Sequence, residues 1–246
     1  MTGSAPAPRI PALDIARGAA LCGMVVYHFT YDLELFGLIA PGTAVSGGWF
    51  VLARVVAASF LFLAGVSLWL AHGAGIRWPG FGRRLATVGA AAAAISAGSW
   101  FAIPEAWVFF GILHAIAFGS LAGLAVLRFH PAAVAVLAVA VAAAGRWAAL
   151  PLFDAPGLQW LGLGTVVPRS VDFVPVFPWF AAVLAGIALA QVAGKAGLWA
   201  RAAGRPAAPG AGLRALAWAG RHSLAIYLIH QPVLVGVLWL ALRLAG

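Results

Sequence analysis

The chain has 246 residues, of which 64% are hydrophobic and only 9% are charged, and its mean hydropathy is +1.01. A soluble domain carries about a quarter charged residues, so this composition excludes a water-soluble globular protein. The formal net charge of +9 does not indicate a nucleic-acid partner, because no basic stretch is interleaved with aromatic residues.

Apolar runs of about twenty residues, long enough to cross a bilayer as helices, recur along the whole chain. Alanine and leucine dominate these runs, which favours helices over barrel strands. We therefore predict an all-α fold, a polytopic transmembrane helix bundle with about seven spans, in one domain covering residues 1–246. The spans are expected at roughly 13–36, 49–71, 84–102, 107–127, 131–150, 174–193 and 221–243.

The connections between the expected spans differ in charge from one side to the other. One side holds Arg9, Arg77, Arg83, Arg84, Arg128, Lys195, Arg201, Arg205, Arg214 and Arg221, and the other holds Glu34, Glu105, Asp154 and Asp172 with Arg146 and Arg169. Because Lys and Arg collect in cytoplasmic loops, this predicts a cytoplasmic N-terminus in the cell inner (plasma) membrane. Loop 194–213 is expected to be a flexible cytoplasmic linker, and loop 151–173 an external lid.

The first expected span carries four ionisable residues, which are costly in hydrocarbon and are therefore candidates for function. Asp14, Arg17, His28 and Asp32 fall within about 60° of one another on a helix. That face must look into protein or water rather than lipid. Asp14 and Arg17 are also close enough in sequence to pair only with each other.

The last expected span repeats this pattern. Ser223, Tyr227 and His230 share one face, and Gln231 lies beside them. Pro232 follows and leaves the carbonyl of Leu228 without its usual helical donor, which loosens the helix next to His230.

Three histidines, His28, His114 and His230, are expected at similar depths in the middle or outer half of the bilayer. A single histidine in a membrane helix often serves only as a hydrogen-bond partner for its neighbour. Three of them, with Asp32 one turn from His28, predict instead a shared cavity. Their spacing is not diagnostic of a metal site, and Cys22 is the single cysteine, so we expect no metal.

Six stretches of this sequence form a recognisable series: LDIARGAALCGMVVYHFTYDLELFG, FLFLAGVSL, GRRL, FFGILHAIAFGSL, DFVPVFPWFAAVLAGIAL and GRHSLAIYLIHQPVL. In this order the series resembles the heparan-alpha-glucosaminide N-acetyltransferase catalytic family, and more closely its short bacterial branch. The likeness runs through nearly the whole chain, and the first and last stretches are the most specific.

The resemblance implies a transmembrane acyltransferase, an N- or O-acetyltransferase that moves an acetyl group from cytosolic acetyl-CoA to an amino-sugar or glycan acceptor on the outer face. It implies His28 as general base or transient acetyl carrier, oriented by Asp32, with His230 and His114 in the same cavity. Animal lysosomal members carry an active-site histidine shortly after the first span, whereas residues 37–48 hold none here, so His28 is the nearest substitute.

Further residues suit the two substrates of such a reaction. Cations are expected to bind the phosphates of acetyl-CoA, and the candidates are Arg83, Arg84, Arg221 and Arg17. The acceptor is expected to meet Asp172, Arg169, Tyr227 and Gln231, of which the last two can also donate to a developing oxyanion.

Two other functions fit the same residues. The His/Asp stripe could be the proton relay of a proton-coupled transporter, against which the short links and the lack of repeated halves argue. The chain could also be a non-catalytic membrane assembly protein, in which the three histidines only pack helices. The sequence also allows a homodimer.

Overall fold

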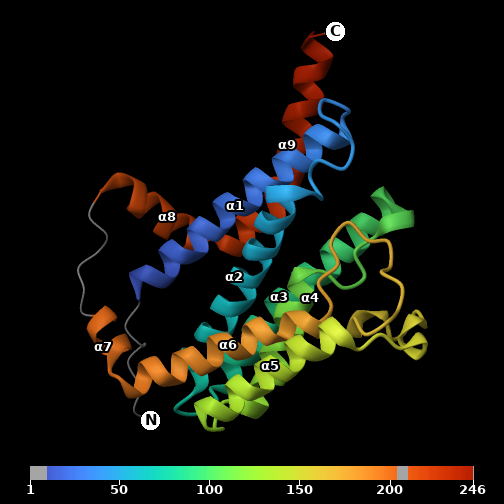
Figure 1. Ribbon diagram of the computed structural model, residues 1–246. Coiled ribbons are helices and arrows are strands. Elements are labelled where there is room, and N and C mark those ends of the chain that lie inside the picture. Colours follow the sequence, from blue (N-terminus) through green and yellow to red (C-terminus); the bar gives the residue numbers. More distant parts are fainter. Residues whose placement is uncertain (1–9, 204–209, 246) are drawn as a thin grey trace. The chain divides into compact units, whose positions relative to one another are not determined.

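The computed structural model describes residues 10–203 and 210–245, and every regular element in that part of the chain is helical (Figure 1). The all-α prediction is therefore confirmed. The α-helices are α1 (Pro11–Leu35), α2 (Gly47–His72), α3 (Trp78–Ala102), α4 (Ile112–Gly123), α5 (Pro131–Trp147), α6 (Val176–Lys195), α7 (Leu198–Ala203), α8 (Ala211–Arg221) and α9 (Ser223–Ala245). The short 3₁₀ helices are η1 (Pro104–Ala106), η2 (Leu124–Val126), η3 (Pro151–Asp154) and η4 (Gln159–Leu161).

Five of these helices, α1, α2, α3, α6 and α9, are long and apolar enough to cross a membrane. The chain is thus a multi-pass membrane protein, as predicted. The expected spans at 107–127 and 131–150 correspond to shorter apolar helices, Ile112–Val126 and Pro131–Trp147. The first is shortened because residues 107–111 are not helical and lead into α4 at Gly111, which has an extended backbone.

Loop 194–213 is more ordered than the predicted flexible linker. Helix α7 and the first residues of α8 lie within it, while residues 204–209 fall outside the described part of the chain. Helix α8 is strongly amphipathic, with Ala217 and Gly220 buried and Arg214 and Arg221 exposed. The apolar face of α8 consists mainly of small alanine and glycine residues, so the hydrophobic pattern of the sequence did not predict this helix.

The contacts divide the chain into two compact units, and each is described by itself. The central unit comprises residues 61–199, and the terminal unit comprises residues 8–60 and 200–246 as far as they are described. Helix α2 contributes its first half to the terminal unit and its second half to the central unit.

In the central unit α5 and α6 pack along each other, α4 packs against both α3 and α6, and the core is aliphatic. Leu61, Val134, Leu184 and Ile187 are fully buried. Glycines bring α2 and α6 into backbone contact, because a side chain at Gly186 would collide with the carbonyl of Phe62. Small residues at such crossings let membrane helices approach closely and gain packing energy.

In the terminal unit α1 packs against α8 and α9. The crossing of α1 and α8 depends on two glycines: a Cβ at Gly18 would collide with the carbonyl of Leu216, and one at Gly220 with the carbonyl of Asp14. Helix α9 follows α8 after the single residue His222, so this crossing also positions the start of α9.

We expect Gly18→Ala to destabilise the protein by about 1–3 kcal/mol, because the added methyl group meets backbone atoms that cannot move aside. Unfolding of the purified protein in mixed micelles would measure the change. The matched control is Gly236→Ala in α9, where an added Cβ meets nothing within 4 Å. Equal stability of the two variants would contradict the close crossing.

Candidate functional site

The terminal unit brings His28 of α1 and His230 of α9 into contact. Their ring centroids lie 4.9 Å apart at an interplanar angle of 63°. Each ring also contacts the tyrosine of its own helix, since Tyr27 lies 5.5 Å from His28 and Tyr227 lies 5.6 Å from His230. Two of the three histidines predicted to share a cavity are therefore neighbours, from opposite ends of the sequence.

Asp32 lies one turn beyond His28 and is completely buried. Its Oδ1 accepts a hydrogen bond of 2.5 Å from Nε2 of Gln231, the residue that follows His230. The carboxylate of Asp32 is thus held by a residue of α9. This contact brings Asp32, His28, His230, Tyr227 and Gln231 into one cluster, which we call the α1/α9 site.

Several polar atoms of the α1/α9 site are buried and have no hydrogen-bond partner among the described residues. They are Nδ1 of His28, Oδ2 of Asp32, Nε2 of His230 and Oε1 of Gln231. A buried polar atom without a partner costs about 1–3 kcal/mol, and most proteins pair nearly all of them. A cluster of four in one place therefore marks a site where other groups are expected to bind.

The hydrogen bond of His230 determines the chemistry of its ring. Nδ1 lies 2.6 Å from the carbonyl oxygen of Tyr227, and a carbonyl can only accept. Nδ1 therefore carries the proton, and in the neutral ring Nε2 has the basic lone pair. Nε2 is buried and has no partner among the described residues, so its lone pair is available to accept a proton from a bound group.

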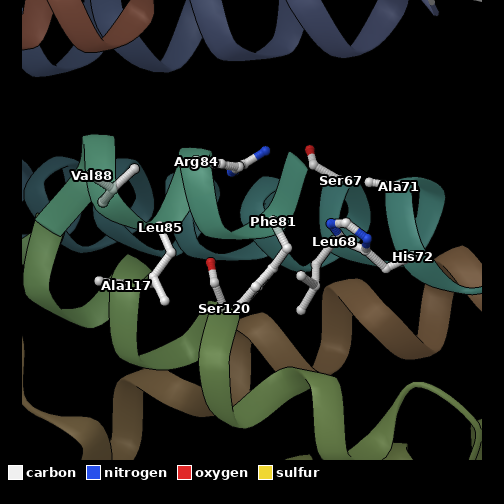
Figure 2. Close-up of a pocket in the computed structure, with 10 residues that line it drawn as sticks. All are labelled: Ser67, Leu68, Ala71, His72, Phe81, Arg84, Leu85, Val88, Ala117 and Ser120. Carbon is white, nitrogen blue, oxygen red and sulfur yellow. The ribbon is translucent and has the colours of Figure 1, made fainter. Parts of the chain in front are cut away.

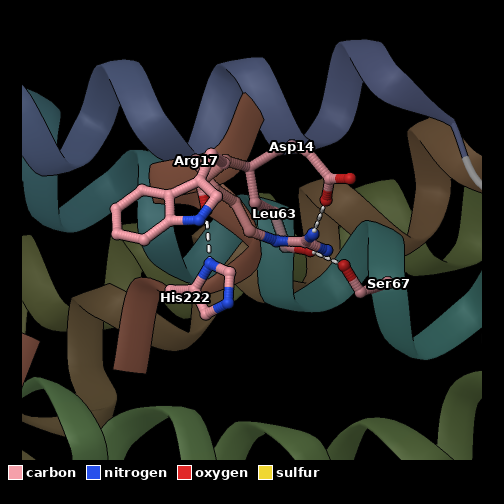
Figure 3. A network of polar contacts seen from close by, with 6 residues as sticks. Asp14, Arg17, Leu63, Ser67 and His222 are labelled. Carbon is pink, nitrogen blue, oxygen red and sulfur yellow. Dashed lines mark hydrogen bonds and ion pairs between the residues drawn. The ribbon is translucent and has the colours of Figure 1, made fainter. Parts of the chain in front are cut away.

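Closer to the N-terminal end of α1, Asp14 and Arg17 form an ion pair. Nη1 of Arg17 lies 2.9 Å from Oδ1 of Asp14, and both side chains are partly buried (Figure 3). At the junction of α8 and α9, Nδ1 of His222 lies 2.9 Å from the carbonyl oxygen of Trp218. The pair satisfies the charge of Arg17, which was expected to bind acetyl-CoA. Arg221, the last residue of α8, is exposed.

His114 lies in the central unit, and both of its ring nitrogens are engaged. Nδ1 accepts from the backbone N–H of Gly111, so Nε2 carries the proton and donates to Oγ of Ser96 at 3.2 Å. The Ser96 hydroxyl in turn donates to the carbonyl of Val108 at 2.6 Å. This chain of bonds fastens α4 to α3, a positioning role that does not require His114 to react.

Asp172, expected at the external mouth, binds the N-terminus of α4. Its Oδ2 accepts from the N–H of Ile112 at 2.9 Å, where the helix dipole favours a negative charge. A side chain at Gly111 would occupy the position of this carboxylate, which explains the glycine. Arg169, the other residue predicted at the mouth, is exposed.

A crevice between α2, α3 and α4 contains Arg84, one of the cations expected to bind acetyl-CoA (Figure 2). Ser67, His72 and Ser120 supply its other polar side chains. Oγ of Ser67 donates to the carbonyl of Leu63, and Nδ1 of His72 accepts from the N–H of Arg77. The crevice has a volume of about 10 Å³, room for at most one water molecule. Arg83 is exposed and does not line it.

Comparison with protein families identifies the chain. The model of the heparan-alpha-glucosaminide N-acetyltransferase catalytic family matches residues 9–232, which covers both units and every residue of the α1/α9 site. The chain belongs to this family. Its members are transmembrane acetyltransferases that in general use acetyl-CoA as donor. No curated protein and no solved structure matches the chain.

In this family member the loop expected to act as a lid is held together by Asp154. Its carboxylate accepts from the hydroxyl and the N–H of Thr165 and from the N–H of Val166. Trp160 packs against Phe110 and Phe118 of the α4 region, with ring centroids 5.5 and 5.6 Å apart. The loop is therefore a folded cover over α4.

Some contributing residues were not expected from sequence. Ser96 and Ser99 were not singled out, although Ser99 Oγ accepts from the N–H of Val108 next to the Ser96 bond. Glu34 folds the following loop back on α1, because its carboxylate accepts from the N–H groups of Gly42 and Ala44 at 2.7 and 2.8 Å. Ser96 and Ser99 lie three residues apart in an apolar span, and this spacing could have indicated that they share one helix face.

The bonds from Thr165 and Val166 lower the pKa of Asp154, because they stabilise the ionised carboxylate. The loop contacts are therefore complete above the ordinary Asp pKa of about 3.9, and are lost as the pH falls through the lowered pKa. We expect faster hydrogen exchange of the Thr165 and Val166 amides in that acidic range, beyond the intrinsic change. Asp154→Asn should remove the pH dependence, and an unchanged dependence in that variant would contradict the assignment.

Proposed function

We propose that this protein transfers an acetyl group from cytosolic acetyl-CoA to the amine or hydroxyl of a sugar acceptor, and that the α1/α9 site is the reacting centre. The observation that carries the proposal is the contact of His28 with His230 beside a buried carboxylate, with several polar atoms lacking partners. Family membership supplies the reaction class, and the geometry supplies the candidate residues.

A purely structural role for this cluster does not explain its unpaired atoms. Other polar side chains within the described helices are paired: Arg17 with Asp14, and both nitrogens of His114 with α3 and the start of α4. Outside the α1/α9 site, one buried side-chain atom of the described residues lacks a partner, Oε1 of Gln191. Inside a membrane an unpaired polar group is especially costly, because no solvent water replaces the missing bond. Retaining such atoms favours a function that pairs them with a substrate.

The roles follow from the atoms. Oδ2 of Asp32 can accept a hydrogen bond from the ammonium or hydroxyl of an acceptor and so orient it. Nε2 of His230 can then take the acceptor's proton as a general base, because it is the ring nitrogen without a proton. His28 contacts that ring, and its own Nδ1 is unpaired, so it can bind the reacting group or relay the proton. Bound acetyl-CoA would supply the acetyl thioester: the acceptor nitrogen or oxygen bonds to the acetyl carbon, the C–S bond breaks, and the departing thiolate takes up the proton held on His230 to leave as coenzyme A.

The arginines predicted to bind the phosphates of acetyl-CoA differ in their exposure and in their ion pairs. The guanidinium of Arg84 lines the crevice and suits a phosphate at its mouth, whereas the hydroxyls of Ser67 and Ser120 already donate to the carbonyls of Leu63 and Ile116. The crevice itself is too small for more than a water molecule, so the body of the donor would lie outside it. Arg83 and Arg221 are exposed and could add charge, whereas Arg17 is neutralised by Asp14.

The finer parts of the proposal rest on family membership and charge distribution. They are the location in the inner membrane, the cytoplasmic origin of the donor, and an amino-sugar or glycan acceptor at the outer face. In this scheme Tyr227 lies against His230 and can contact the acceptor. Asp172 and His114 would act indirectly, by fixing the start of α4 under the folded loop.

We expect His28→Ala and His230→Ala each to lower acetyl transfer by about 10²–10⁴-fold, the usual contribution of a general base. The assay is transfer of labelled acetyl groups from acetyl-CoA to amino sugars by the purified protein in liposomes. The matched control is His222→Ala, an exposed histidine bonded to the carbonyl of Trp218. The control should retain near wild-type activity.

Full activity of both His28→Ala and His230→Ala would remove the α1/α9 site from the reaction. A different result would favour the transporter alternative: pH-driven solute flux in the same liposomes, lost in both variants and independent of acetyl-CoA. Retained binding of coenzyme A by the inactive variants would separate a lost chemical step from a lost fold.

We expect Arg84→Gln to raise KM for acetyl-CoA about tenfold while leaving kcat nearly unchanged, since a phosphate contact remote from the acetyl group contributes uniform binding. Steady-state kinetics with varied acetyl-CoA would measure both constants. Arg146→Gln, an exposed arginine at the end of α5, is the control. A fall in kcat with an unchanged KM would contradict the phosphate-binding role.

A further inference from the structure

A second concave surface lies in the central unit, at the end where α6 finishes and α5 begins. This groove is open and has a volume of about 360 Å³. The residues lining it are Trp69, Leu127, Arg128, Phe129, His130, Pro131, Gln191 and Lys195. None of them belongs to the α1/α9 site or to the Arg84 crevice, and the acetyl-transfer proposal does not use them.

The groove presents positive charge and hydrogen-bond donors. Arg128 and Lys195 are exposed cations from different segments, and none of the described residues that line the groove is acidic. Nδ1 of His130 accepts from the N–H of Ala132, so its Nε2 carries the proton and is a third donor. This set of donors suits a phosphate group.

Gln191 adds the feature that an adventitious cluster of surface cations would lack. It is only 4% exposed, and its Nε2 donates to the carbonyls of Leu127 and Phe129 at 3.0 and 3.1 Å. These two bonds fix the amide orientation, because carbonyls accept only from the nitrogen. Its Oε1 is therefore an acceptor, buried and unpaired among the described residues. A ligand that fills the groove should carry a donor next to its phosphate.

The surroundings of the groove indicate the source of that phosphate. It lies where apolar helices end, beside Trp69 and the 55% exposed Phe129, and aromatic residues are typical of the membrane–water interface. Basic pockets at such helix ends bind phospholipid headgroups. A headgroup ammonium would be repelled by Arg128 and Lys195, so a hydroxyl is the better donor for Gln191.

We propose that this groove binds the headgroup of an anionic phospholipid, with Arg128, His130 and Lys195 on the phosphate and Oε1 of Gln191 accepting from a headgroup hydroxyl. Phosphatidylglycerol has this chemistry. The site would anchor the end of α6 to the link between η2 and α5, which Gln191 already joins.

The test uses the delipidated full-length protein in detergent, titrated with phosphatidylglycerol and followed by native mass spectrometry. We expect Arg128→Gln/Lys195→Gln to weaken binding about tenfold or more, from the loss of two interfacial charges. The control pair is Arg54→Gln/Arg146→Gln, which removes two exposed arginines outside the groove and should bind as the wild type does. Phosphatidylcholine should bind more weakly than phosphatidylglycerol to the wild type.

Parallel titrations separate lipid from other phosphate sources. Displacement of phosphatidylglycerol by coenzyme A or by inorganic phosphate at equal concentration would overturn the proposal, as would equal loss of binding in both double variants. If the groove variant does not remain monodisperse, Lys195→Gln alone serves, since the exposed side chain of Lys195 can change without altering the core. Unchanged lipid affinity in that variant also counts against the proposal.

Discussion

The structure depends on one constraint: a polar group within a membrane helix must find a partner inside the protein. His114 shows how such a group is satisfied, since its two ring nitrogens bond to Ser96 and to the N–H of Gly111. The α1/α9 site departs furthest from this constraint, because four of the buried atoms without a partner among the described residues lie there, on two histidines, a glutamine and a fully buried aspartate. This departure distinguishes the site more clearly than the presence of histidine does.

Close glycine contacts make that arrangement possible. Gly18 and Gly220 let the backbones of α1 and α8 touch, and the single-residue junction at His222 then directs α9 along α1. The result places His230 against His28 and Gln231 against Asp32. Packing of the smallest residues in the terminal unit therefore determines where its most polar residues meet.

Helical periodicity predicted much of this from sequence, but not the partners across helices. The stripe on the first span and the face of the last span were visible as spacings, and their histidines do meet. The bond from Gln231 to Asp32 joins positions 199 apart, and the rotation of α9 about its axis decides it. The carboxylate of Asp172 caps α4, and a spacing of 60 residues from Ile112 carries no signal of that contact in the sequence. Its contact with an acceptor stays a prediction.

Basic residues in a membrane protein can orient it in the bilayer or bind a ligand, and a cation alone does not distinguish the two roles. The predicted topology by itself would account for Arg84, Arg128 and Lys195 in connections or near helix ends, since Lys and Arg collect on the cytoplasmic side of membrane proteins. It does not explain why Arg128 and Lys195 flank a buried amide whose oxygen has no partner among the described residues. Orientation of the protein in the membrane depends only on how many positive charges lie on each side. Binding of a ligand also requires uncharged hydrogen-bonding groups at defined positions. The buried amide of Gln191, rather than the cations, is therefore the observation that supports the proposal of a ligand in the groove.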